Sequence, residues 1–165
     1  MRQVLSLVLL SAIAVLPAAP QQTKPDFSGR WVLDLTKTEA PAQPPEMEQV
    51  IDHKDPVLKW TTKFKDTGAS ETMLPFLIGI ADGQAEVRAD GKEEAVKNGP
   101  FERRSHTVWD GQRLVTTWTM KTPQDPPEGR WVRSLSADGK TQIIDIEFRS
   151  AVMGTVQAKL IFSKR

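Results

Sequence analysis

Few side chains in this sequence could act as an acid, a base or a nucleophile. The chain has no Cys and no Tyr, and its only histidines are His53 and His106. Ser105, His106 and Asp110 supply the residue types of a hydrolase triad, but neighbouring residues of a strand point to opposite faces, so Ser105 and His106 cannot act together. No spacing of His and carboxylate residues is typical of a metal site. The sequence therefore predicts a protein that is not an enzyme and that uses no cofactor and no metal.

The two histidines lie in different settings. His53 stands in His-Lys-Asp-Pro, which is typical of a turn, and we predict an exposed imidazole without a partner. His106 lies on a predicted strand and shares a face with Arg104 and Val108. If that face is inward, the interior holds a cationic and titratable group. An enzyme of the same fold class that uses His106 is therefore one alternative to a non-catalytic protein.

These side chains must be positioned by strands, because period-two alternation of apolar and polar residues recurs along the chain and helical periodicity does not. Four Asp-Gly pairs, at 82–83, 90–91, 110–111 and 138–139, predict hairpin turns between antiparallel neighbours. Residues 75–100 are the hardest to assign. The clearest predicted strands are 102–109, 113–121, 129–136, 141–149 and 155–163.

The predicted fold is all-β, an antiparallel up-and-down meander of eight to ten strands that closes into a barrel, since closure removes exposed sheet edges. A sandwich is the alternative. Two Pro-rich stretches, 39–46 and 122–129, cannot form central strands and are predicted to be loops on the barrel rim. An interaction or stress-related module of the cell envelope that works through these loops is a second functional hypothesis.

The first residues have the features of an export signal. Arg2 precedes an apolar run from Val4 to Leu16, which is shorter than a membrane-spanning helix and is followed by small residues. We predict a signal peptide over 1–22, a single domain over 23–165, and a periplasmic or extracellular location. The 22 basic side chains less Arg2 leave 21 against 21 acidic ones, and this balance argues against nucleic acid or an anionic membrane as a partner.

The segment Asp-Phe-Ser-Gly-Arg-Trp at 26–31 resembles the G-x-W segment of lipocalins and other calycin-type barrels. Together with 51–59, Trp-Asp-Gly at 109–111 and 135–141, it is similar to small exported lipocalin-like bacterial proteins of uncharacterised function. The resemblance implies a structural role for Gly29 and Trp31, with the Trp at the closed end of the barrel under a basic residue from a late strand. Three residues lie late enough in the chain to cover it: Arg149, Lys164 and Arg165.

The interior of such a barrel could hold one small apolar or amphipathic ligand. Trp60, Phe64, Trp118 and Met120 project one way from two predicted strands, although they could instead fill a core without a cavity. With a basic residue inside, an acidic amphiphile such as a fatty acid would fit, because a guanidinium pairs with a carboxylate through two hydrogen bonds. The candidate ligand-binding residues are Trp60, Phe64, Arg104, His106, Trp118, Met120 and Arg133.

Arg133 has two possible orientations. It alternates with Trp131 and Leu135, and on that face it would be buried and would require a carboxylate, ordered water or an anionic ligand. The interpretation that we favour from the sequence is that Val132 marks the inner face and that Arg133 is solvated.

Overall fold

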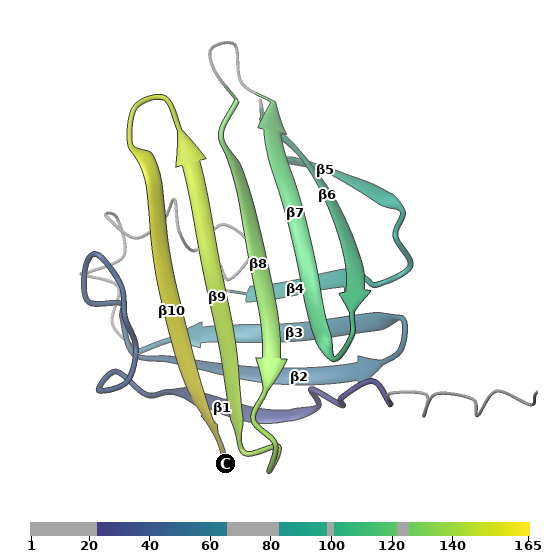
Figure 1. Cartoon of the computed structure of the whole chain (residues 1–165), viewed down its shortest axis with the longest axis vertical. Helices are drawn as coiled ribbons and strands as arrows, with labels where there is room; N and C mark the ends of the chain where they lie inside the picture. The colour runs from purple at the N-terminus through teal and green to yellow at the C-terminus, as the bar shows by residue number, and fades with distance from the viewer. Residues whose placement is uncertain (1–22, 66–82, 99–100, 122–125) are drawn as a thin grey trace, which may run out of the picture.

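The computed structural model describes residues 23–65, 83–98, 101–121 and 126–165 (Figure 1). The predicted signal peptide lies outside the described residues, as do parts of 75–100 and of the loop 122–129. Within the described ranges the chain forms ten strands and no helix. The strands are β1 (Gly29–Leu33), β2 (Met47–Lys54), β3 (Val57–Phe64), β4 (Gly83–Arg88), β5 (Glu93–Asn98), β6 (Phe101–Asp110), β7 (Arg113–Lys121), β8 (Glu128–Leu135), β9 (Thr141–Ser150) and β10 (Gly154–Lys164).

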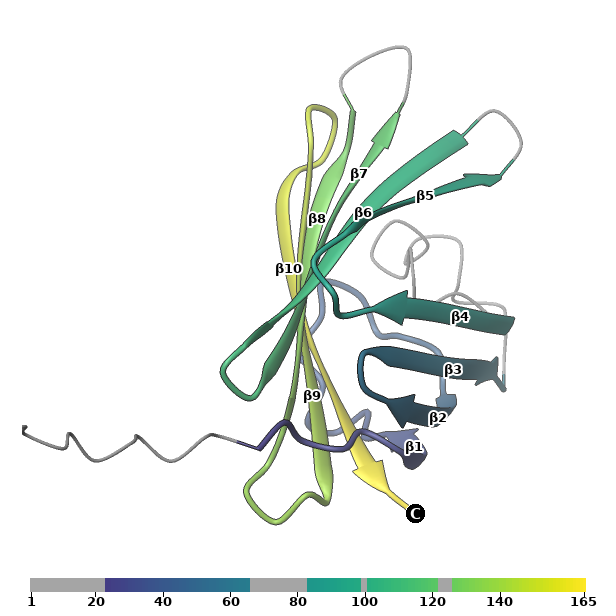
Figure 2. The ribbon, with the colours of Figure 1, turned by 90° about the vertical axis from the view of Figure 1, so that its right-hand side faces the viewer.

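All ten strands belong to one antiparallel sheet in the order β4-β3-β2-β1-β10-β9-β8-β7-β6-β5. The sheet curls so that β1 to β4 cross β6 to β10 at a large angle, with one face turned inward (Figures 1 and 2). This confirms the predicted all-β, up-and-down fold, and β6 to β10 begin and end within one residue of the predicted segments. The sheet is a curled half-barrel, because β4 and β5 form its two edges and do not pair with each other.

The turn at Asp90-Gly91 differs from the prediction. Gly91 has a positive φ of 74°, as a tight turn requires, but β4 and β5 diverge from it instead of pairing (Figure 2). The backbone around the turn bonds to other segments: Ala89 N donates to Pro56 O at 2.7 Å, and Gly91 N donates to Thr107 O at 3.1 Å. These bonds fix the turn to the β2–β3 turn on one side and to β6 on the other, so the predicted hairpin is wrong although the predicted turn is present.

Trp31 anchors one end of the inner face. It is fully buried, its Nε1 donates to Phe27 O at 2.9 Å, and Lys164 Nζ lies 5.2 Å from the centre of its ring. Of the three late basic residues, Lys164 is therefore the one that covers the ring. A Cβ on Gly29 would lie 2.7 Å from Lys164 Cε, and Gly29 has a φ of 139°, so the glycine makes room for the lysine over Trp31.

Gly129 makes room for the ring of Trp118 in the same way. A Cβ at this position would lie 2.4 Å from two carbons of the Trp118 ring, which must lie against the bare backbone of β8. We expect Gly129→Ala to lower the free energy of unfolding by about 1–3 kcal/mol, because the ring has to leave its packed position. Urea unfolding of the single variant and of Gly129→Ala in a Trp118→Leu background measures this. An equal cost in both backgrounds would show that the ring contact is not the cause.

Candidate functional site

Arg133 lies at the centre of the inner face of the sheet, on β8 between Leu114 of β7 and Ile144 of β9. It is only 5% exposed. Its Nη1 donates to Gln142 Oε1 at 3.3 Å and to Gln49 Oε1 at 3.4 Å, and its guanidinium carbon lies 4.7 Å from the centre of the Trp60 ring. Every one of these partners is neutral, and none of the described carboxylates forms an ion pair with Arg133.

The solvated orientation that we favoured for Arg133 is therefore wrong. Both faces of β8 are covered at this point, since Val132 is also only 5% exposed, and so hydrophobicity could not distinguish the inner face from the outer. Burial lowers the pKa of Arg133 to about 10, which still leaves the side chain charged at neutral pH. A buried cation that is balanced only by amide oxygens is costly to keep, because its charge has no counter-ion.

A second group of donors lies beside Arg133 on the inner face, formed by Arg103, Trp118 and Trp131; we call it the indole cluster. The Trp118 and Trp131 rings are tilted against each other with their centres 5.8 Å apart, and the Arg103 guanidinium carbon lies 6.0 Å from the centre of the Trp131 ring. Among the described residues, Arg103 Nε and the Nε1 atoms of both indoles are buried without a hydrogen-bond acceptor. The Trp60 ring lies against the Arg133 guanidinium, and its Nε1 is likewise buried without an acceptor among the described residues.

The four predicted aromatic and apolar residues share this inner face. Trp60 and Trp118 are buried, whereas Phe64 and Met120 are partly buried at its margin. The structure thus brings them together with Arg133, and whether they bind a ligand stays a prediction.

Arg104 and His106 lie on the outer face of β6 and do not reach the interior. Arg104 pairs there with Glu102 and Glu93, and His106 Nδ1 lies 3.5 Å from Thr117 Oγ1. We had expected both side chains to be able to line a cavity, and this expectation is wrong. The inward face of β6 was assigned one residue out of register, since Arg103 and not Arg104 lies opposite Met120 on that face.

The sequence contained a signal that could have placed Arg103. The hairpin at 110–111 pairs Asp110 with Arg113, and the same ladder sets Arg103 opposite Met120 and Ser105 opposite Trp118. Paired residues lie on the same face of a sheet, so an inward Trp118 requires an inward Ser105 and Arg103. The contributions of Gln49 and Gln142 to the site had no comparable signal, because they come from strands far apart in sequence.

The groove around His106 is an open feature of the outer face, about 370 Å³ in volume, and also includes Arg130, Glu147 and Arg149. In the parts of the chain that the structure describes, no group of three His, Asp or Glu residues could hold a metal ion, and no long apolar helix could cross a membrane.

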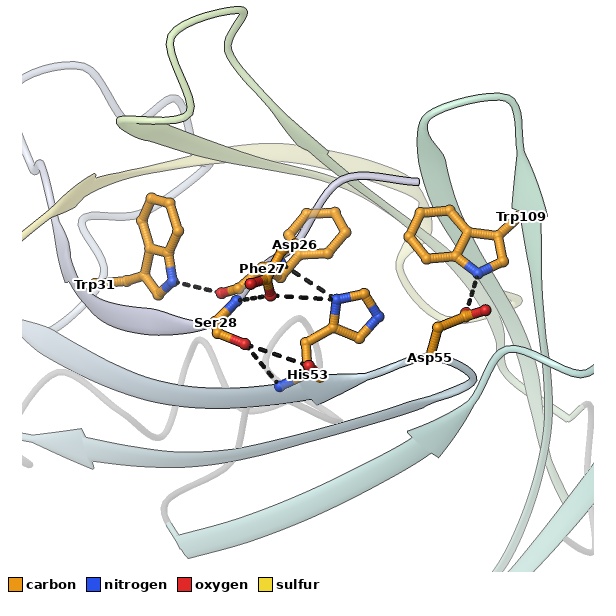
Figure 3. A network of polar contacts seen from close by, with 7 residues as sticks. All are labelled: Asp26, Phe27, Ser28, Trp31, His53, Asp55 and Trp109. Atoms are coloured by element: carbon orange, nitrogen blue, oxygen red, sulfur yellow. Dashed lines mark hydrogen bonds and ion pairs between the residues drawn. The ribbon is translucent and has the colours of Figure 1, made fainter. Parts of the chain in front are cut away.

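His53 belongs to a polar network that closes one end of the fold (Figure 3). Its side chain is 5% exposed, so the predicted surface imidazole is wrong. Phe27 N donates to His53 Nδ1 at 3.3 Å, and Ser28 Oγ accepts a bond from His53 N at 3.0 Å. Next to it, Trp109 Nε1 donates to Asp55 Oδ1 at 2.8 Å. The segment before β1 is thus bound to the turn between β2 and β3.

Asp55 connects this network to Lys24, whose Nζ lies 2.6 Å from Asp55 Oδ2. The hydrogen bond from Lys24 is the main reason that the pKa of Asp55 lies below its ordinary value of 3.8; burial opposes it, and the bond from Trp109 adds to it. A lowered folded pKa contributes stability that is present above the unfolded value and is lost as the pH falls through the folded one.

We therefore expect Asp55→Asn to be less stable than the wild type at pH 7, and the difference to disappear as the pH falls below the unfolded value of 3.8. The loss should be at most about 1 kcal/mol, because the carboxylate is partly exposed. Urea unfolding at a series of pH values measures it, with Asp52→Asn on the neighbouring outer face as the control. A difference that persists at low pH would mean that the charge of Asp55 is not responsible.

Comparison with known proteins identifies the architecture and nothing finer. No protein-family model matches the sequence, and no curated protein matches it. A point mutant of the fluorescent protein UnaG superposes with a TM-score of 0.55 at 14% identity, covering 84% of this chain and 96% of that one. The fold is lipocalin-like.

Secretory abundant heat soluble protein 4 from Ramazzottius varieornatus matches this lipocalin-like chain with a TM-score of 0.56 at 14% identity, covering 89% of it and 99% of that protein. A further secretory abundant heat soluble protein of the same organism gives a TM-score of 0.52 at 12% identity, with coverages of 88% and 99%.

Proposed function

We propose that this lipocalin-like protein binds and carries a small amphipathic anion, such as a fatty acid, on the inner face of its sheet, and that it does so without catalysis. The observation that carries the proposal is Arg133, a cation that is 5% exposed and has no carboxylate partner among the described residues. An unpaired buried charge is costly to keep, and a ligand carboxylate would supply the missing partner through charge-assisted hydrogen bonds.

The surroundings of Arg133 suit the rest of such a ligand. The inner face around it is apolar and aromatic, and it includes Trp60, Trp131 and Leu114, all buried. Binding sites for small molecules combine such a lining with a few polar groups that fix the orientation of the ligand. We further propose that the protein is exported to the periplasm or beyond the cell after removal of residues 1–22, which have the features of a signal peptide.

The first Pro-rich loop gives less support to a function at the barrel rim. Pro44 and Pro45 are buried, and Glu39 exchanges two backbone hydrogen bonds with Lys159, at 2.9 and 2.6 Å. The loop is therefore held against β10 at Glu39 and packed at Pro44 and Pro45, and only the short stretch 41–43 between these points is exposed. This favours the inner face as the binding site.

The proposal is tested by a pair of ligands that differ only in their head group. We expect hexadecanoate to bind at least about tenfold more tightly than hexadecan-1-ol in calorimetric titrations, because a hydrogen bond to a charged group is worth about 1.5–3 kcal/mol. Native mass spectrometry of the protein purified from its exported form, followed by solvent extraction, should release an acidic lipid. Equal affinity for the acid and the alcohol, or no binding of either, would refute the proposal.

A further inference from the structure

Several hydrogen-bond donors on the inner face are buried without an acceptor among the described residues. The chain has five Trp residues. Trp31 Nε1 donates to Phe27 O and Trp109 Nε1 donates to Asp55 Oδ1, whereas the Nε1 atoms of Trp60, Trp118 and Trp131 are buried without an acceptor among the described residues. A buried donor without a partner is destabilising, so a group of three together with Arg103 Nε is unusual in a protein core.

The charges of this face are unbalanced in the same direction. Arg103 and Arg133 both point inward. Glu94 lies on the same face, opposite Ser105, and its negative charge stabilises the charged form of Arg103. Burial raises the pKa of Glu94, with Asp90 and Glu86 as further causes, whereas Arg88 and Arg103 lower it. Arg133 has no carboxylate partner among the described residues, so positive charge remains in excess on this face. The described part of the inner face is therefore cationic and rich in donors.

The indole cluster is adjacent to Arg133 and yet separate from its hydrogen-bonded group. Trp131 and Arg133 are two residues apart on the same face of β8, which places their Cα atoms roughly 7 Å apart. Arg133 is surrounded by Gln49, Gln142 and Trp60, whereas Arg103 lies against Trp131. A single anionic head group that occupies the first position would leave the donors of the indole cluster unpaired.

We propose that the ligand carries a second carboxylate, held by Arg103 together with the indole N–H groups of Trp118 and Trp131, so that the protein is a carrier of dicarboxylic amphiphiles. This inference rests on the proposed function, since it adds a second position to the same binding face. Two oxygens of a carboxylate can accept from Arg103 and from an indole at once, which no aliphatic chain can do.

Paired titrations distinguish this inference from the proposed function. Saturated dicarboxylic acids of increasing chain length are compared with the monocarboxylic acids of the same lengths by calorimetry. We expect the best diacid to bind at least about tenfold more tightly than its monoacid, the effect of one added charged hydrogen bond. Arg103→Met should bring this ratio to about one without weakening the monoacid. The matched control is Arg104→Met, which removes the adjacent guanidinium from the outer face and should change neither affinity.

Indole resonances provide a second readout that does not depend on affinity. In the two-dimensional ¹H–¹⁵N spectrum the five indole N–H signals are assigned through single Trp→Phe variants. The monoacid should shift the Trp60 signal, and the diacid should in addition move the signals of Trp118 and Trp131 downfield. Trp31 and Trp109 already have acceptors in the protein, so their signals should stay in place and serve as internal references.

The outcomes separate the two proposals. Binding of the monoacid with no preference for any diacid, or a preference that survives Arg103→Met, overturns the dicarboxylate inference and leaves the proposed function standing. Diacid binding that leaves the signals of Trp118 and Trp131 unchanged also overturns it. Failure of both acids to bind overturns the proposed function and the inference together.

Discussion

Replacement of Arg133 by Met should weaken the binding of an acidic ligand at least about tenfold and at the same time make the ligand-free protein more stable, by about 1–2 kcal/mol. The two effects have one cause. The guanidinium is buried with neutral partners, and the lowering of its pKa to about 10 reflects the cost of keeping the charge out of water. Met has a similar length and no charge, so it removes this cost and also the partner of the ligand.

Two losses limit the gain in stability. Met cannot donate to the amide oxygens of Gln49 and Gln142, and it gives up the contact of the cation with the Trp60 ring. Both bonds are long, at 3.4 and 3.3 Å, so we expect the relief of the buried charge to exceed them.

The measurement combines urea unfolding of delipidated protein with calorimetric titration of hexadecanoate. Arg130→Met is the matched control, because Arg130 lies on the outer face of the same strand, is exposed, and should affect neither quantity. A variant at Arg133 that loses stability but keeps its affinity would show that the arginine is a structural residue and not part of a binding site.

Replacement of Trp31 by Ala should cost about 3–5 kcal/mol of the free energy of unfolding, a large part of the stability of a domain of this size. The ring is fully buried between β2 and β10, under Lys164. Its removal leaves a cavity that the surrounding strands cannot close, and it also leaves Phe27 O without its donor.

A Trp31→Phe variant separates the two contributions. Phe keeps most of the ring volume but lacks Nε1, so it should lose about 1–2 kcal/mol, mainly for the hydrogen bond to Phe27 and a smaller cavity. Thermal and urea unfolding of both variants measure the difference. A cost below about 1 kcal/mol for Trp31→Ala would contradict the assignment of Trp31 as the anchor of this end of the sheet.

The local elements of the fold could be predicted from the sequence because they depend on local patterns. The alternation in β7 and β9 is strong, and the Gly-containing turns at Gly111 and Gly139 have the positive φ that the Asp-Gly pairs indicate, 60° and 68°. The separation of β4 and β5, which do not pair after their turn, could not be predicted in this way. It depends on where the backbone of Ala89 and Gly91 finds its partners, and these are Pro56 in the turn between β2 and β3 and Thr107 in β6.

The site was predicted less well because burial on both faces of a strand removes the contrast between them. In β8, Trp131, Val132 and Arg133 are all buried, so the alternation could not assign the arginine to a face. In β6 the inward residues include Ser105 and Thr107, which are polar, and the pattern therefore suggested the wrong register. The paired glutamines around Arg133 come from β2 and β9, and only the folded sheet brings them together.

The pairing of β1 with β10 has a kinetic consequence. Trp31 is opposite Lys164 in the ladder, so β1 cannot meet this partner until β10 has been synthesised. Contacts between distant parts of a sequence form slowly, since the entropy of closing the loop is lost before the contact gains any energy. The emerging polypeptide therefore lacks this pairing until β10 has left the ribosome. Such a delay favours transport of the chain in an unfolded form, the state in which a protein with the proposed leader would cross a membrane before folding on the other side.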